Sequence, residues 1–306
     1  MAVTSSHSAP PAATAIQRWI IASRPRTLPA SAAPVIAATG LAIHAGKFSP
    51  LPALACLLAA VLLQIGANFA NDVFDYKKGA DTHERLGPTR VTQAGLLTPR
   101  QVYAGMAVVF GLAALLGVYL ALVAGWVIIA IGVFSILAAL AYTGGPYPLG
   151  YHGLGEVFVF LFFGPIAVCG TYFAQAKAFS ASSLWVAIPM GLLTIAILVV
   201  NNLRDIDTDR AGGKRSLSVR FGAEWTRKEY IGVIGAAYLF PAAMWLSGNA
   251  SAWVMLTWLS LPYFISLVQA IYRHTGRPLN QALAGTGQLE LLFGLLFFAG
   301  LLIPVV

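Results

Sequence analysis

Charged residues are scarce in this chain of 306 residues. Asp, Glu, Lys and Arg together make up only 10% of it, whereas 58% of the residues are hydrophobic. The mean hydropathy is +0.76. A soluble globular domain carries about 25% charged residues, so this composition excludes one and is typical of a protein that crosses a membrane many times. The net charge of +8 therefore indicates contact with anionic headgroups and an anionic substrate rather than with nucleic acid.

Cysteine and histidine are also few. Cys56 and Cys169 both lie in apolar runs, so the sequence predicts neither a disulfide framework nor a Cys-x-x-Cys site. The five histidines show no paired spacing, which argues against a histidine metal site. Residues 1–14 are rich in Ser, Ala and Pro and contain no acid, so we expect a disordered tail there. No short apolar region with a cleavage site follows, and we expect no removable secretory signal.

The few acidic side chains are concentrated where two long apolar runs end. Seven of the 11 Asp and Glu residues lie there or in the loops that follow. In each run an amide and two carboxylates recur at spacings of i, i+4 and i+7 or i+8, so each set lies along one face of a helix. The first set is Asn68, Asp72 and Asp75, and the second is Asn201, Asp205 and Asp209.

Carboxylates placed so close together require a cation. Two of them about 5 Å apart repel by roughly 3 kcal/mol at an effective dielectric near 20, and each one is costly beside hydrocarbon. Hard oxygen ligands favour Mg²⁺. The pattern therefore predicts Mg²⁺ at these helix ends, with Asn68, Asp72, Asp75, Asp205 and Asp209 as its ligands.

Basic residues follow each acidic set. Gly87-Pro-Thr-Arg90 comes after the first, and Gly213-Lys214-Arg215 comes after the second. Acids that hold a metal beside bases that bind phosphate make a composite site for a metal diphosphate. The same bases could also act only as topology signals at the membrane surface, and the spacing alone leaves that alternative open.

Nine apolar segments are long enough to cross a bilayer. They centre on residues 28–46, 51–75, 101–122, 124–143, 154–174, 183–204, 228–247, 251–272 and 281–303. All Lys and Arg residues except Lys47 and Lys177 fall on one side of these segments. The positive-inside rule then places the N-terminus in the cytoplasm and the C-terminus on the opposite side. We expect an all-α polytopic protein, in which residues 15–306 form a single bundle with a cavity that faces the cytoplasm.

The two motifs, on spans two and six of nine, make this chain resemble the UbiA superfamily of intramembrane aromatic prenyltransferases. Within it the chain is most similar to the branch that prenylates 1,4-dihydroxy-2-naphthoate in menaquinone biosynthesis. The stretches that carry the resemblance are Arg24-Pro-Arg-Thr27, Asn71-Asp72-x-x-Asp75 with Lys78-Gly-x-Asp81, Gly87-Pro-x-Arg90, Tyr142-Thr-Gly-Gly145, Gly153-Leu-Gly-Glu156, Phe163-Gly164, and Asn201-Asn-Leu-Arg-Asp-Ile-x-x-Asp209-Arg with Gly213-Lys214. The resemblance covers the chain from about residue 18 to the C-terminus.

The resemblance implies a reaction and a set of roles. Two Mg²⁺ ions would bridge a polyprenyl diphosphate, with Asp72 and Asp205 as the catalytic metal ligands. The dihydroxynaphthoate ring would then attack the allylic cation with loss of CO₂, giving demethylmenaquinone and diphosphate. The diphosphate contacts would be Arg26, Arg90, Asn201 and Lys214. The protein would be a multi-pass protein of the cell (inner) membrane, surrounded by membrane lipid, with no nucleic acid and no obligatory protein partner.

Some positions depart from the family pattern or stay ambiguous. The loop from Pro146 to Gly153 has no Lys or Arg, although some relatives carry a Lys there, so Arg90, Lys214 or Arg26 would have to supply that charge. Whether Asp75 or Asp81 contacts the metal is open. Asp207 points away from the other acids on a helix, and we expect it to be solvated.

Glu290, the aromatic residues of span five and two other functions remain in consideration. We expect Glu290, inside the last span, to form an interhelical hydrogen bond rather than to act in catalysis. The aromatic residues of span five, such as Phe158, Phe160 and Phe162, are expected to serve packing more than to surround a cation. The alternative functions are a prenyltransferase for 4-hydroxybenzoate, homogentisate or another acceptor, and a membrane transporter that uses paired acidic motifs.

Overall fold

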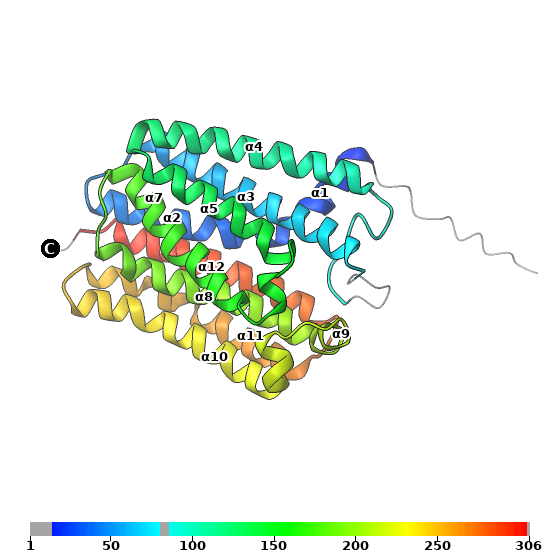
Figure 1. Ribbon diagram of the computed structural model, residues 1–306. Coiled ribbons are helices and arrows are strands. Elements are labelled where there is room, and N and C mark those ends of the chain that lie inside the picture. The colour runs from blue at the N-terminus through cyan, green and yellow to red at the C-terminus, as the bar shows by residue number, and fades with distance from the viewer. Residues whose placement is uncertain (1–13, 80–85, 305–306) are drawn as a thin grey trace, which may run out of the picture.

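The computed structural model describes residues 14–79 and 86–304, and every regular element in this part of the chain is a helix (Figure 1). The membrane-spanning helices are α2 (Leu28–His44), α3 (Pro50–Lys77), α4 (Pro99–Ala124), α5 (Val127–Thr143), the continuous helix α6–η3–α7 (Gly155–Leu161, Phe162–Ile166 and Ala167–Ala176), α8 (Ser182–Arg204), α10 (Leu217–Leu246), η4–α11 (Ala252–Ser260 and Leu261–Arg273) and α12 (Leu279–Leu301). Eight stretches of the described chain are long and apolar enough to cross a membrane, and the first of them, Ala15–His44, is counted together with α1 and η1, which precede α2. α2 and α5, with 17 residues each, are at the short end of the range. The predicted all-α, polytopic fold is confirmed.

Four short helices lie outside the spans. They are α1 (Ala15–Ser23), η1 (Pro25–Thr27), η2 (Leu149–Tyr151) and α9 (Ile206–Ala211). Most of the predicted disordered tail, residues 1–13, lies outside the described residues, as do Asp81 and Glu84. α1 and α9 are at one end of the bundle, and the C-terminal end of α12 is at the other (Figure 1).

The turn between α1 and α2 has a strained backbone. Thr14 and Gln17 form a capping box that starts α1. The helix ends at Arg24, whose φ of 50° is in the left-handed region that residues other than glycine rarely adopt. Pro25 follows directly and disfavours a right-handed helical conformation at Arg24. The chain therefore bends at Arg24, whose guanidinium lies 4.0 Å from Asp72 of α3.

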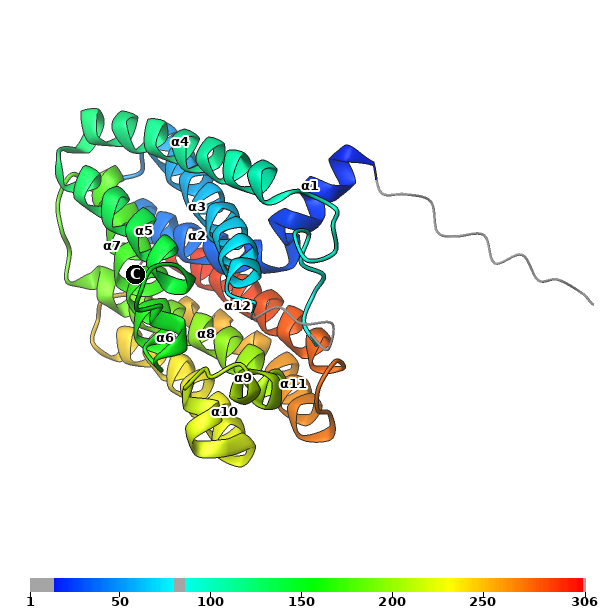
Figure 2. The ribbon, with the colours of Figure 1, turned by 45° about the vertical axis from the view of Figure 1, so that its right-hand side comes forward.

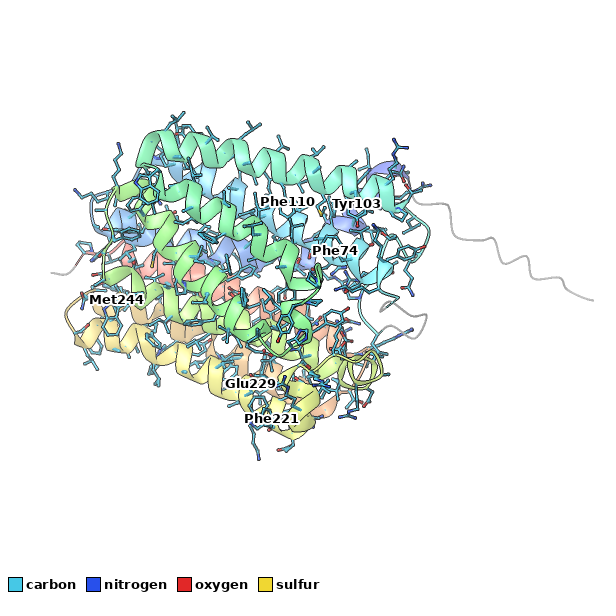
Figure 3. All side chains as sticks on the ribbon, in the orientation of Figure 1. Phe74, Tyr103, Phe110, Phe221, Glu229 and Met244 are labelled. Atoms are coloured by element: carbon cyan, nitrogen blue, oxygen red, sulfur yellow. The ribbon has the colours of Figure 1, made fainter. Side chains whose placement is uncertain are left out.

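Glycine allows the helices to pack closely. A Cβ at Gly66 of α3 would overlap the Phe110 ring of α4 (Figure 3). A Cβ at Gly294 of α12 would lie 3.1 Å from the Ala33 carbonyl oxygen of α2. Because lipid tails are as apolar as the side chains, such close van der Waals contact is what holds membrane helices together.

A π-helical turn shapes the wall formed by α6–η3–α7. Pro165 lies inside η3, where it interrupts the regular hydrogen-bond pattern of an α-helix. Gly164 of this turn approaches α8 so closely that a Cβ would lie 2.7 Å from the Ala187 carbonyl oxygen. The turn therefore fixes this wall against α8, whose last residues include Asn201 (Figure 2). The second acidic set does not lie on one helix as predicted, because α8 ends at Arg204 and Asp209 belongs to α9.

Candidate active site

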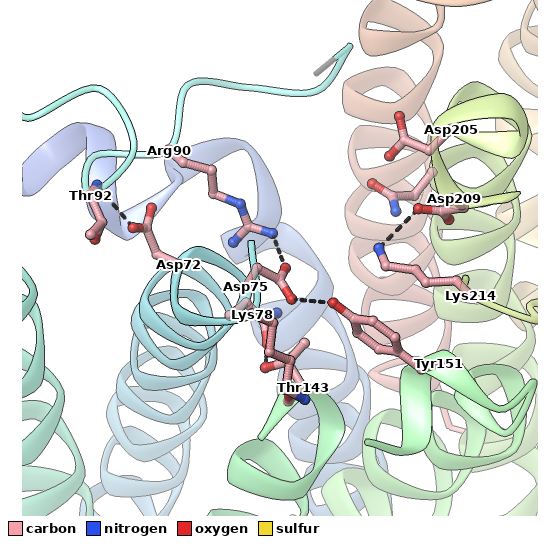
Figure 4. A network of polar contacts seen from close by, with 12 residues as sticks. Asp72, Asp75, Lys78, Arg90, Thr92, Thr143, Tyr151, Asp205, Asp209 and Lys214 are labelled. Atoms are coloured by element: carbon pink, nitrogen blue, oxygen red, sulfur yellow. Dashed lines mark hydrogen bonds and ion pairs between the residues drawn. The ribbon is translucent and has the colours of Figure 1, made fainter. Parts of the chain in front are cut away.

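A cavity of about 850 Å³ opens at the end of the bundle where α3 and α8 finish. The polar residues at its mouth include Asn68, Asn71 and Asp75 from α3, and Asn201, Asn202, Asp205 and Asp209 from α8 and α9. Its deeper part is apolar, with Val35, Leu120 and Ile128 on the wall. The two predicted acidic stretches are thus brought to one cavity, on opposite sides of its mouth (Figure 4).

Asp75 is the carboxylate of α3 that lines this cavity. Its side chain is 4% exposed and accepts a hydrogen bond of 2.7 Å from Arg90 and one of 2.9 Å from the Tyr151 hydroxyl (Figure 4). Lys78, one turn further on, donates to the Thr143 carbonyl oxygen at 2.6 Å. Partial burial lowers the pKa of Lys78, and the nearby Asp75 carboxylate opposes this shift.

Asp72 has different surroundings, although it belongs to the same predicted set. It is 1% exposed and is not among the residues that line the cavity. One carboxylate oxygen accepts from the backbone N–H of Val91 at 2.9 Å and the other from that of Thr92 at 3.0 Å. The Arg24 guanidinium lies 4.0 Å away. Its predicted role as a metal ligand stays a prediction.

The amides beside these carboxylates are oriented by neighbouring helices. Asn68 donates from its side-chain nitrogen to the Ser23 carbonyl oxygen at 2.9 Å and to the Thr27 hydroxyl at 3.0 Å. Its amide oxygen is then the atom suited to a metal. Asn71 accepts from the Thr143 hydroxyl at 2.8 Å. Asn71 was not a predicted ligand, but it lines the cavity one turn before Asp75.

On the other side of the mouth, Arg204 pairs with the adjacent Asp205. Its guanidinium donates from Nε and Nη2 to the two oxygens of the Asp205 carboxylate. It also donates to Asn201 at 2.9 Å and to Asn280 of α12 at 2.7 Å. The Arg204 side chain is fully buried. Such a bidentate, charge-assisted pair fixes the position of the carboxylate.

Asp209 is paired with the predicted base Lys214 at 2.9 Å. Burial raises the pKa of Asp209, and the Lys214 ammonium group opposes this effect. Asp207, on the same short helix, has a side chain that is 93% exposed and lies 3.5 Å from Arg210. The expected solvation of Asp207 is confirmed.

Tyr151 connects the two sides of the site. Its hydroxyl donates to Asp75, and its backbone oxygen accepts from Arg215 N–H at 2.8 Å. The ammonium groups of Lys78 and Lys214 each lie 5.1 Å from the centre of its ring, a distance at which the ring face attracts a cation. Lys78 and Lys214 therefore place two positive charges beside the loop from Pro146 to Gly153, which contains no Lys or Arg.

Sequence reasoning missed four residues of this network: Asn71, Lys78, Tyr151 and Arg204. Lys78 offered a signal, because it follows the first acidic set directly. Tyr151 offered none, since its contacts depend on how a loop folds back over the cavity.

Arg26 is not brought to the cavity. It lines a separate groove between α11 and α12, together with Tyr263 and Gln281. Arg24, two residues earlier, lines the cavity instead. Glu290 accepts a hydrogen bond of 2.6 Å from Thr194 of α8, so the expected interhelical hydrogen bond is confirmed.

The aromatic residues of α6 and η3 divide between two environments. Phe158 and Phe162 line the cavity, as does Tyr142 of α5. Phe160 packs against Gly191 of α8, where a Cβ would lie 2.8 Å from its ring. Packing thus accounts for Phe160, while the other rings face the space in which an apolar ligand would lie.

The donor set at the mouth fits Mg²⁺. Every candidate ligand supplies a carboxylate or amide oxygen, which is the chemistry that this ion prefers. In residues 14–79 and 86–304 no group of three or more His, Cys, Asp or Glu side chains is already gathered around one point. The acids instead pair with arginine, lysine, tyrosine or backbone N–H groups, so a metal would have to exchange with these internal partners.

Comparison with curated proteins gives close relatives over nearly the whole length. The chain is 40% identical over 281 residues to the 1,4-dihydroxy-2-naphthoate octaprenyltransferase of Mycobacterium tuberculosis, which covers 91% of this chain and 94% of that protein. It is 36% identical over 294 residues to the enzyme of the same name from Escherichia coli, covering 93% and 95%.

Solved structures agree on the fold. A UbiA homologue from Archaeoglobus fulgidus, bound to GPP and Mg²⁺, superposes with a TM-score of 0.69 at 15% identity and covers 94% of this chain and 100% of that one. The model of the UbiA prenyltransferase family matches residues 31–286. These matches confirm the resemblance found in the motifs, and the chain belongs to the UbiA prenyltransferase family.

Proposed function

We propose that this protein transfers a polyprenyl group from polyprenyl diphosphate to 1,4-dihydroxy-2-naphthoate, with release of diphosphate and CO₂. The observation that carries the proposal is that two helix ends rich in oxygen ligands meet at the mouth of one apolar cavity. The two relatives described above, both named for this reaction, support the choice of acceptor. The product is demethylmenaquinone in its reduced form.

The mouth of the cavity would hold the diphosphate. Asn68, Asn71 and Asp75 face it from α3, and Asp205 and Asp209 face it from the other side. Mg²⁺ held by these oxygens would neutralise the diphosphate and make it a better leaving group. Both sides would contribute, because one carboxylate and two amides supply only one negative charge with which to hold the Mg²⁺ that neutralises a diphosphate.

The basic residues would bind the diphosphate oxygens. Arg90 and Lys214 now pair with Asp75 and Asp209, on opposite sides of the mouth. With those carboxylates holding a cation, both bases could turn to the diphosphate oxygens. Asn201, which also lines the cavity, can donate to it from its amide nitrogen.

The deeper cavity would accommodate the prenyl chain and keep water out. Breaking the C–O bond of the diphosphate leaves an allylic cation, which water would quench. The rings of Tyr142, Phe158 and Phe162 present faces that attract a cation in such a place. The ring carbon that bears the carboxylate then forms the new C–C bond, and the carboxylate leaves as CO₂.

The distribution of basic residues supports an orientation in the membrane. The ends of α3 and α8 carry Lys77, Lys78 and Arg204, whereas Lys47 follows the opposite end of α2. We place the mouth of the cavity at the cytoplasmic face of the cell (inner) membrane, with residues 15–306 as a single catalytic domain.

A direct assay tests the function. Purified protein in detergent is given Mg²⁺ and a long polyprenyl diphosphate with dihydroxynaphthoate, 4-hydroxybenzoate or homogentisate. We expect a prenylated naphthoquinol, and no product from the Asp205→Asn variant, which must show the same elution profile as the unchanged protein. Product from another acceptor but not from naphthoate would reject the proposed acceptor. Absence of any product from a folded protein would favour a transporter.

A further inference from the structure

The segment Leu86–Thr98 connects α3 to α4 beside the mouth of the cavity. Val91 and Leu97 are buried in a small apolar cluster with Phe69 and Val73 of α3. Residues 90–96 form one helical turn, in which Ala94 N–H donates to the Arg90 oxygen at 2.9 Å and Leu96 N–H donates to the Val91 oxygen at 2.9 Å. The segment is therefore folded against α3.

A helical turn leaves the first N–H groups at its start without partners inside the turn. Here these are the N–H groups of Val91 and Thr92, and both residues are buried. Asp72 accepts from both of them, one with each carboxylate oxygen. A side chain from another helix thus caps the turn, in the way that an N-cap residue does from within the chain.

Asp72 and Asp75 serve different partners because of their positions on α3. Three residues along a helix correspond to about 60° around its axis. Asp75 faces the cavity, whereas Asp72 faces the segment. Arg90, the residue just before Val91, donates to Asp75 at 2.7 Å. Capping the turn through Asp72 therefore fixes the place from which the Arg90 side chain enters the site.

We propose that Asp72 is a positioning residue, which caps this turn and so holds Arg90 in the site, rather than a ligand of the Mg²⁺. Asp72 does not line the cavity, and a metal that reached it would compete with the two buried N–H groups that start the turn. The Asp72 charge is also compensated by Arg24, 4.0 Å away. This role rests on the proposed function, and it assigns to Asp72 the placement of the Arg90 side chain.

The first test is proteolysis, which needs no turnover. Trypsin cleaves after Arg90, a bond that is buried here, and mass spectrometry identifies the cut. In Asp72→Asn the amide offers only one acceptor and opposes the second N–H with a donor of its own. We expect this variant to be cut after Arg90 at least about 10-fold faster than the unchanged protein, the fold-change of a lost charge-assisted hydrogen bond. Asp75→Asn, the matched control, should stay resistant.

A second measurement on the unchanged protein avoids any variant that fails to fold. Mg²⁺ alone is added before trypsin. If Asp72 is a positioning residue, the bond after Arg90 remains protected or becomes only modestly accessible as Arg90 leaves Asp75. Cleavage in Mg²⁺ as fast as in Asp72→Asn would mean that the metal takes Asp72 from the turn, which would overturn the proposal.

Kinetics then separate positioning from metal binding. Asp72→Asn and Arg90→Ala should each raise the KM for prenyl diphosphate by about 10-fold, and the double variant should be no worse than the poorer single one. The Mg²⁺ concentration for half-maximal rate should change in Asp75→Asn but not in Asp72→Asn. A large shift in Asp72→Asn, with additive effects in the double variant, would reject the proposal. If neither the unchanged protein nor any variant forms product, the proposed function fails. The proteolysis result still decides the role of Asp72.

Discussion

The buried ion pair between Arg204 and Asp205 allows a quantitative prediction. Arg204 is the last residue of α8, and its side chain has no exposed surface. Replacing it by methionine, which has a similar length, removes the cation from which both Asp205 oxygens accept. It also removes the donor to Asn280 that connects α8 with α12. We expect Arg204→Met to lower the free energy of unfolding by about 3–5 kcal/mol, the range for breaking one partner out of a buried pair.

The double variant separates pairing from burial. Replacing both residues, as in Arg204→Met with Asp205→Leu, leaves no uncompensated charge, and such replacements are often neutral or stabilising. We expect the double variant to recover most of the lost stability while remaining inactive. The measurement is an unfolding titration with SDS in mixed micelles, followed by circular dichroism.

Arg210→Met is the matched control. Arg210 pairs with Asp207 at 3.5 Å, but its side chain is 58% exposed, and exposed pairs contribute little. We expect no resolvable loss of stability. If Arg204→Met were no more destabilising than Arg210→Met, the argument that Arg204 compensates the second acidic set from inside the protein would be refuted.

Two further predictions concern the same site. Tyr151→Phe removes the hydroxyl that donates to Asp75 but keeps the ring near Lys78 and Lys214, so the KM for prenyl diphosphate should rise about 10-fold. Tyr147→Phe, which changes an exposed side chain, is the control. Equal effects on KM in the two variants would contradict this role of Tyr151. Chelation of Mg²⁺ should stop product formation while leaving the unfolding temperature unchanged, because the carboxylates that line the mouth already have internal partners; a marked drop in that temperature, measured by scanning fluorimetry, would show that the metal holds the bundle together.

The spans and the pairing of the two acidic sets could be predicted from the sequence. Long apolar runs have few alternatives to membrane helices. Carboxylates beside hydrocarbon cost free energy, so acids at the ends of two such runs indicate that the two ends share a compensating cation. Which acid faces the cavity could not be predicted. Asp72 and Asp75 share one broad face of α3, and only the folded segment after the helix distinguishes them.

Which basic residue faces the cavity could not be predicted from the sequence either. Arg24 and Arg26 are two positions apart, and the sequence favoured Arg26. The left-handed conformation at Arg24 turns the chain so that Arg24 faces the cavity and Arg26 faces the groove beside α12. Local backbone geometry of this kind leaves no trace in charge patterning.

The length of α3 has a consequence for how a lipid-borne substrate arrives. Its 28 residues extend for about 42 Å, whereas the hydrocarbon layer is about 30 Å thick. With Pro50 at the far surface and no tilt, 30 Å of helix would end near Ala70, which would put Asn71 and Asp75 at the level of the phosphates of the surrounding lipids. A polyprenyl diphosphate with its tail among the acyl chains and its diphosphate among the lipid phosphates would lie at that depth. It could then enter the cavity by lateral diffusion in the membrane, without changing its depth.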